Sequence, residues 1–309
     1  MPHCSKTSPT ARSWVLGLAV FNLLRCGLDG TVTSFAAFPT GQRIESAIYA
    51  SDGNFYGVTL GTDVVPASTS YVFRATPSGA LTTLYTFPPN TFTQFSATPL
   101  LLAHDGNLYG STATGGANGT GMIYKLTLDG QFTVLHSFEK GKFPAGPTTL
   151  IEASDGNLYG DAQSYVTAGQ LFRITKSGQY TPLYDMRAPS GACPCWLVQG
   201  SDGIIYGTAA VGGSGNSGTV FALDAGLAKP GPQPQSFSPQ SGAVGTNVRI
   251  WGQNLLSAAV QFNGVAAATV SNSGPNYVWA TVPAGAITGP ITVATPGGTE
   301  TTQASFTVQ

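Results

Sequence analysis

The sequence predicts an all-β protein: a small β-propeller of about four four-stranded blades, closed by the N-terminal strand and followed by an immunoglobulin-like β-sandwich. Two observations lead to this class. A motif of the type Ser-Asp-Gly-Asn-Leu-Tyr-Gly occurs four times, and its aspartates are Asp52, Asp105, Asp155 and Asp202. Their spacing of about 50 residues is typical of propeller repeats. In addition, the 40 Gly and 21 Pro separate short apolar runs, as an all-β chain with many turns requires.

Each repeat is predicted to contain four antiparallel strands. In the second copy the expected strands cover residues 99–104, 107–112, 122–127 and 131–138. The Asp105-Gly106 pair between the first two is expected to form a tight primed hairpin turn, because these residue types tolerate positive φ angles. Four strands of ordinary length within about 50 residues match one propeller blade.

The two ends of the repeat array predict how it closes. The fourth copy has three expected strands, and its pattern stops at Asp224 without a fourth. Residues 28–38 resemble residues 128–138, which form the last turn and strand of the second copy. We therefore expect the N-terminal segment to supply the missing strand and close a ring, since an open array leaves sheet edges unpaired.

The repeats resemble the bacterial GloVer family. Its pattern combines Asp-Gly-Asn-Leu-Tyr-Gly-Thr, a Gly-Gly loop and a Gly-Thr-Val-Phe-Lys-Leu strand, and the resemblance covers about residues 28–224. The third copy departs in its loop at residues 163–169, and the fourth has Ile204 in place of Asn. The resemblance implies an exported protein with a propeller-like fold. It implies no general activity.

The N-terminal residues 1–27 predict a signal or targeting segment. Lys6 and Arg12 precede an apolar run at residues 15–24, which is as long as a signal h-region and too short to span a bilayer. The mature protein is therefore expected to be secreted or at the cell surface, with no membrane-spanning segment. Cys193 and Cys195 are read as a local disulfide or as two unpaired thiols, because two thiols do not complete a metal site.

A second domain is expected behind a Pro-rich linker at residues 225–235. Within residues 236–309, apolar residues alternate with small or polar ones, which is typical of half-buried strands. The expected strands cover residues 247–251, 259–262, 277–282, 291–294 and 305–308. The segments at residues 237–246, 260–265 and 282–286 resemble an IPT/TIG immunoglobulin-like domain, which implies a spacer or protein-contact module.

Candidate site residues come from charged positions in the repeats. Arg74, Lys125 and Arg173 occupy equivalent places in the third strands and could together receive an acidic ligand, although strand charges also block edge pairing. The longer loops on the opposite face from the tight turns are expected to carry function. The acidic candidates there are Asp63, Asp161 and Glu139. No cofactor or metal ligand set is predicted.

Two functions remain open at this stage. A net charge of −1 without a basic block argues against nucleic-acid partners. We expect a non-enzymatic exported or cell-surface binding protein, whose partner is a polysaccharide or a surface protein. The alternative is a polysaccharide hydrolase or lyase that uses two of Asp63, Asp161, Glu45 and Glu139, which would have to lie within about 5–10 Å of each other.

Overall fold

The computed structural model describes residues 17–19, 22–26, 31–39, 42–50, 52–61, 69–88, 99–139, 146–163, 168–187 and 192–309. These residues contain strands and no helix, so the all-β prediction is confirmed. The chain divides into two compact units. The first contains the described residues up to Val198 together with Tyr206–Phe221, and the second contains Gln199–Ile205 and Ala222–Gln309.

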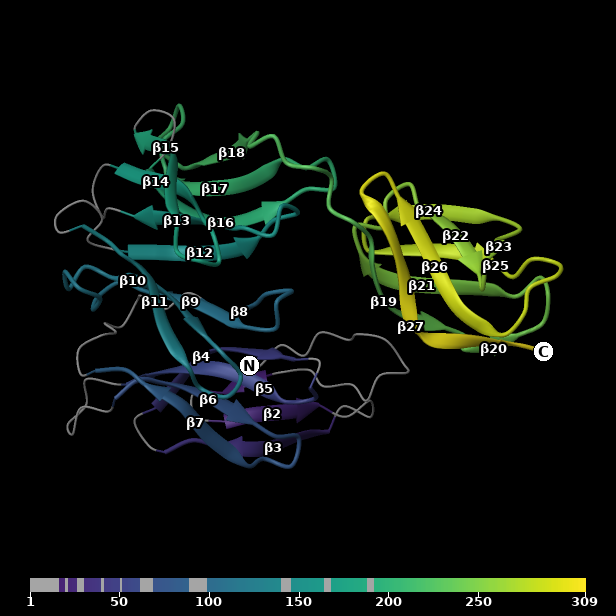
Figure 1. Cartoon of the computed structure of the whole chain (residues 1–309), viewed down its shortest axis with the longest axis horizontal. Coiled ribbons are helices and arrows are strands. Elements are labelled where there is room, and N and C mark those ends of the chain that lie inside the picture. The colour runs from purple at the N-terminus through teal and green to yellow at the C-terminus, as the bar shows by residue number, and fades with distance from the viewer. Residues whose placement is uncertain are drawn as a thin grey trace. The chain divides into compact units, whose positions relative to one another are not determined.

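The first unit is a row of consecutive antiparallel sheets, each made from one stretch of sequence (Figure 1). Three of them have four strands: β4–β7, β8–β11 and β12–β15. Two have three strands: β1–β3 at the N-terminal end and β16–β18 at the C-terminal end. This is the propeller-like repeat architecture that the fourfold motif predicts.

The strands follow the expected positions within the repeats. The first complete sheet contains β4 (Gln42–Tyr49), β5 (Phe55–Gly61), β6 (Tyr71–Ala75) and β7 (Leu81–Thr86). The second contains β8 (Leu101–Leu102), β9 (Leu108–Thr112), β10 (Met122–Leu126) and β11 (Phe132–Ser137). The third contains β12 (Gly146–Glu152), β13 (Leu158–Gln163), β14 (Ala168–Ile174) and β15 (Tyr180–Arg187). The last contains β16 (Ala192–Gln199), β17 (Ile205–Val211) and β18 (Thr219–Leu223).

The Asp-Gly turns differ in type from the prediction. In the second copy Gly106 donates its N–H to the Ala103 carbonyl at 2.9 Å, and Ala103 donates to the Asn107 carbonyl at 3.0 Å. Gly106 has φ +77°, whereas Asp105 is not among the positive-φ residues. The connection is therefore a three-residue loop closed by a left-handed glycine and not a two-residue primed turn. Asp105 therefore does not supply the positive φ angle of the turn. Its carboxylate instead accepts a hydrogen bond from the Asn107 N–H at 3.1 Å.

The predicted ring closure by the N-terminal strand is wrong. Residues 32–37 form β3 (Val32–Ala37), which pairs with β2 (Asn22–Cys26), and β2 also pairs with β1 (Gly17–Ala19). β18 pairs only with β17 among the described strands. The register of β2 with β3 shifts between Leu23 and Leu24, and β6 with β7 shifts between Val72 and Phe73. The N-terminal segment is thus part of an additional, partial repeat.

Two strands of that partial repeat, β1 and β2, lie in the predicted signal segment, residues 1–27. An apolar run can serve as an h-region or as buried strands, and its composition does not distinguish the two. Here Leu23 is fully buried in a core that includes Phe38, Phe55 and Phe73. Export through this segment remains a prediction.

The second unit consists of two sheets around one apolar core. One sheet has the order β19-β21-β25-β24 and the other β20-β27-β26-β22-β23. The first sheet comprises β19 (Gln233–Ser238), β21 (Asn247–Gln253), β25 (Tyr277–Thr281) and β24 (Val270–Gly274). The second comprises β20 (Ser241–Gly242), β27 (Gly298–Val308), β26 (Gly289–Thr295), β22 (Ala259–Phe262) and β23 (Val265–Ala266). Both contribute to the core, for example through Ile250 and Val278 on one side and Val293 and Phe306 on the other. β19 begins inside the expected linker, residues 225–235.

Candidate functional site

In the first three copies the Asp-Gly turn holds the tyrosine of its own motif. Tyr56 donates its hydroxyl to Asp52 at 2.7 Å, and Tyr109 donates to Asp105 at 2.8 Å. Burial and the neighbouring Asp52 carboxylate raise the pKa of Tyr56 to about 12. Burial alone would raise the pKa of Asp52, but hydrogen bonds from Asn54 and Tyr56 outweigh it and lower that pKa. These pairs fix the turns and are structural.

The three predicted cations lie in separate sheets, each opposite such a tyrosine. In the ladders Arg74 pairs with Tyr56, Lys125 with Tyr109 and Arg173 with Tyr159. The Arg74 charge helps to lower the pKa of Asp52, and Arg173 counteracts part of the rise in the pKa of Tyr159. The arginines therefore face the tyrosine–aspartate pair of their own repeat.

The acidic candidates are distributed differently from the expectation. Asp161 is fully buried within β13, and Glu139 is exposed two residues after the end of β11. Glu45 accepts a hydrogen bond from Arg43 at 2.8 Å. Asp63 lies outside the described residues, as do most of the longer loops. The carboxylate pair that a glycosidase requires thus remains a prediction.

The strongest ionic cluster joins two repeats at their tight turns. Glu152 accepts hydrogen bonds from Lys176 Nζ at 2.5 Å and from the His104 backbone N–H at 2.8 Å, and its Oε2 lies 2.7 Å from His104 Nδ1. Lys176 also lies 4.0 Å from Asp105. Only 6% of the Glu152 side chain is exposed. All four groups are engaged with one another, so this cluster connects repeats instead of presenting a vacant site.

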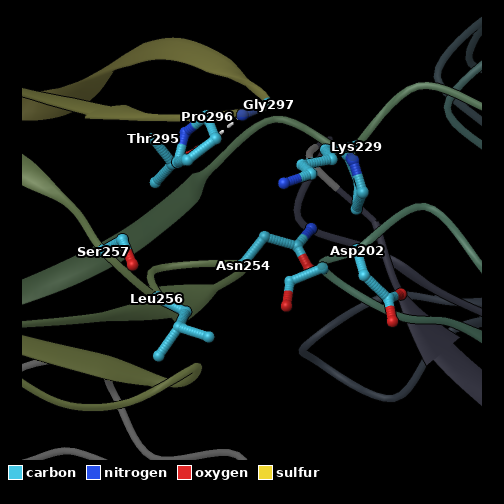
Figure 2. Close-up of a pocket in the computed structure, with 10 residues that line it drawn as sticks. Asp202, Lys229, Asn254, Leu256, Ser257, Thr295, Pro296 and Gly297 are labelled. Carbon is cyan, nitrogen blue, oxygen red and sulfur yellow. Dashed lines mark hydrogen bonds between the residues drawn. The ribbon is translucent and has the colours of Figure 1, made fainter.

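A small pocket lies in the second unit (Figure 2). Its volume is about 160 Å³, which is below the range of about 300–1,000 Å³ usual for ligand pockets. Its polar lining is partly engaged: Asn254 donates to the Gly231 carbonyl at 3.1 Å, and Gly297 donates its N–H to Thr295 Oγ1 at 3.3 Å. Within the described residues no group of three or more His, Cys, Asp and Glu side chains is arranged to hold a metal ion. The pocket is not our candidate.

The candidate site is on the sheet face of the second unit that points away from the core. In β21 the buried Val248 and Ile250 alternate with Arg249 and Trp251, and in β25 the buried Val278 alternates with its neighbours. The alternation places Arg249 and Trp251 on the outer face together with Tyr277 and Trp279. The ladder pairs Arg249 with Trp279 and Trp251 with Tyr277. We call these four residues the aromatic platform.

Arg249 sits among the three rings of the platform. Its guanidinium carbon lies 4.0 Å from the centre of the Tyr277 ring, 4.9 Å from Trp251 and 5.7 Å from Trp279. These distances are those of cation–π contacts, which are strongest with Trp. The rings hold the cation in place without neutralising its charge.

No acid of the described part of the chain neutralises Arg249. Among the described residues it forms no ion pair, and its buried Nε has no hydrogen-bond partner. Trp279 is 39% exposed, so part of an indole face is open to solvent. Hydroxyl and amide groups border the platform: Ser238 pairs with Arg249, Ser271 pairs with Trp279, and Asn247 pairs with Thr281. The surface thus combines an exposed ring, a fixed unpaired cation and small polar groups.

Sequence reasoning did not identify the platform, although the signal was present. The alternation within residues 247–251 and 277–282 marks these segments as half-buried strands, and the outward positions of both hold large aromatic or cationic side chains. Outward positions of an ordinary surface strand carry small or charged polar groups. What the sequence does not show is that the two strands are adjacent and in a register that brings Arg249 against Trp279.

The described fold and surface define a propeller-like repeat protein with an additional two-sheet unit. The chain belongs to the Gloeobacter/Verrucomicrobia repeat family, whose pattern matches residues 25–277. This confirms the repeat family that the sequence predicts.

Several solved structures are similar in fold. Virginiamycin B lyase from Staphylococcus aureus is 16% identical over 93% of this chain and 88% of its own, with a TM-score of 0.48. A luciferin-regenerating enzyme is 13% identical over 95% of this chain and 77% of its own, with a TM-score of 0.45. A putative gluconolactonase is 12% identical over 84% and 80%, with a TM-score of 0.42.

No curated protein matches the sequence. Within the described residues no helix is long and apolar enough to cross a membrane.

Proposed function

We propose that this chain is a non-enzymatic binding protein, exported or at the cell surface, and that its aromatic platform binds acidic polysaccharide. We also propose that the second unit is an IPT/TIG immunoglobulin-like sandwich. In this proposal it is a ligand-binding module and not only a spacer. The single observation that carries the proposal is the unpaired Arg249 held among Trp251, Tyr277 and Trp279.

The ligand class follows from the chemistry of these groups. The apolar C–H face of a pyranose ring packs on an exposed aromatic ring, and Trp279 offers such a ring at low cost in conformational entropy. A guanidinium donates paired hydrogen bonds to a carboxylate, so a uronic acid residue satisfies Arg249. The bordering serine and threonine hydroxyls suit sugar hydroxyls. A neutral glycan would leave Arg249 without an anionic partner.

The affinity can be tested by isothermal titration of the full chain with polygalacturonate, and with cellohexaose as the neutral probe. Binding of polygalacturonate is expected to be the stronger of the two. We expect Trp279→Ala to weaken it about 5-fold or more, because stacking on an aromatic side chain is worth about 1–3 kcal/mol for nucleic-acid bases. Arg249→Gln is expected to abolish the preference for the acidic polymer over the neutral one.

Trp196→Ala is the matched control, because Trp196 is also exposed and lies on β16 in the repeat unit. It should bind like the unmodified protein. The proposal is contradicted if Trp196→Ala and Trp279→Ala lose the same affinity for polygalacturonate. It is also contradicted if the unmodified protein binds polygalacturonate and cellohexaose equally well. Circular dichroism verifies that each variant is folded.

The sequence-based expectation that the longer loops of the repeats carry binding remains a separate prediction, because most of those loops lie outside the described residues. The hydrolase or lyase alternative requires two of Asp63, Asp161, Glu45 and Glu139. Of these, Asp63 lies outside the described residues, Asp161 is buried and Glu45 pairs with Arg43. No described pair of those acids favours it.

A further inference from the structure

The outer face of the platform sheet is organised in rows, because side chains paired across a ladder lie on the same face. One row runs through Arg249 and crosses all four strands. Ser238 of β19 pairs with Arg249 of β21. Trp279 of β25 pairs with Arg249 on one side and with Ser271 of β24 on the other. We call these four residues the Arg249 row, and their order across the sheet is hydroxyl, cation, indole, hydroxyl.

The rows on either side of it offer little to a polar ligand. In one of them Thr281 donates its hydroxyl to Asn247 at 2.6 Å, and the same oxygen lies 2.6 Å from the Thr269 hydroxyl. These polar groups therefore satisfy one another. In the other row the rings of Trp251 and Tyr277 pack against the guanidinium. A polar ligand is thus expected to lie along the Arg249 row.

The groups of the Arg249 row remain available. Among the described residues, no hydrogen bond involves the hydroxyl of Ser238 or Ser271. Arg249 has no acidic partner there, and Trp279 is 39% exposed. The row therefore presents one cation and one open ring side by side, with a free hydroxyl at each end.

The spacing of the row suits a polysaccharide that crosses the strands. Neighbouring strands lie about 4.8 Å apart. This distance is close to the length of one sugar residue in an extended polysaccharide, so successive sugars would lie over successive members of the row. One sugar then lies over Arg249 and the next over Trp279. The serine hydroxyls meet the sugars on either side.

We propose, on the basis of the proposed function, that the platform selects a polysaccharide in which uronic acid residues alternate with uncharged sugars. Arg249 pairs with the carboxylate of the uronic acid, and the uncharged sugar packs on the ring of Trp279. A polymer of uronic acids alone would bring a second carboxylate to Trp279. That carboxylate would lose water without gaining a cation, which is unfavourable.

Isothermal titration of the full chain with two octasaccharides tests this selection. One is a hyaluronan octasaccharide, which alternates glucuronic acid with N-acetylglucosamine, and the other is octagalacturonate. The hyaluronan octasaccharide should bind about 5-fold more tightly, because an unpaired carboxylate at the indole opposes the binding of octagalacturonate. It carries half as many carboxylates, so attraction by charge alone predicts the opposite order.

Ser271→Arg adds a second cation beside Trp279, at an exposed position. This variant should lose the preference, because the second carboxylate of octagalacturonate then has a partner. Ser305→Arg is the matched control, since Ser305 is exposed on β27 in the other sheet of the same unit. It should keep the preference of the unmodified protein. Circular dichroism verifies that both variants are folded.

The outcomes separate this inference from the proposed function. If neither octasaccharide binds, the proposed function fails and the inference fails with it. If octagalacturonate binds at least as tightly as the hyaluronan octasaccharide, the platform binds acidic polysaccharide but does not select the alternating kind. A Ser271→Arg variant with an unchanged preference also overturns the inference.

Discussion

Single charged residues distinguish one repeat junction from the others. Glu152, His104 and Lys176 replace residues that carry no charge at the equivalent positions of the other copies, such as Leu102 and Ser154. Burial would raise the pKa of Glu152, but hydrogen bonds from Lys176 and His104 outweigh this and lower that pKa below 4.5. The carboxylate is therefore more stable in the folded protein than in the unfolded chain.

The sign of the pH dependence follows from this shift. Because the folded pKa is lowered, the contribution of Glu152 is complete above the unfolded value of 4.5 and is lost as pH falls through the folded pKa. Glu152→Gln should reduce the free energy of unfolding at pH 7 by about 1–3 kcal/mol. The free energy of unfolding of this variant should also fall less steeply than that of the unmodified protein as the pH is lowered. Urea unfolding at several pH values measures both.

Glu45→Gln provides the control, because Glu45 pairs with Arg43 at the surface, with side chains 31% and 44% exposed. Exposed pairs contribute about 0–1 kcal/mol. If the two variants lose the same stability with the same pH profile, the Glu152 cluster does not hold the repeats together.

At the scale of the strand, the final glycine of each motif creates space for an aromatic ring. A Cβ on Gly57 or Gly160 would overlap the ring of Phe73 or Phe172, and one on Gly110 would overlap Tyr124. These rings come from the third strand of the same sheet, and the register places each opposite its glycine. The motif therefore specifies strand packing as well as the turn.

Gly110→Ala is expected to destabilise the protein by about 1–3 kcal/mol, because Tyr124 is buried and has no room to move. Thermal unfolding measures the loss. Gly215→Ala is the matched change in a loop, where the nearest atom to the new Cβ is Ser217 Oγ at 3.5 Å. It should be close to neutral. A Gly110→Ala protein as stable as Gly215→Ala contradicts the packing role.

At the scale of the whole molecule, the chain has two units with separate apolar cores. The cores of the repeats include Tyr124 and Phe172, and the core of the second unit includes Ile250 and Phe306. Units with separate cores need not unfold together.

Calorimetry of the full chain should thus show two transitions. Gly110→Ala should lower the temperature of one transition. Ile250→Ala should lower the temperature of the other, because it destabilises the second unit by about 2–5 kcal/mol. A single transition that both variants shift equally contradicts independent unfolding.

Local pattern alone determined much of the fold. The period of about 50 residues placed the strands of the repeats, because each blade is made from one continuous stretch and its hairpins are local. Alternation located the strands of the second unit, since its core faces one side of each sheet. The sequence also shows that the pattern of the last copy stops after three strands, and the described part of that sheet has three.

Only the tertiary structure decided which distant segments meet. The residues before β3 look alike as a leader and as strands, and β3 pairs with β2 and not with β18 as the sequence predicts. Arg249 and Trp279 become neighbours through register, and Glu152 reaches His104 through the stacking of repeats. A sequence records residue types and spacing along the chain, whereas a binding surface or an ion cluster depends on distances across it.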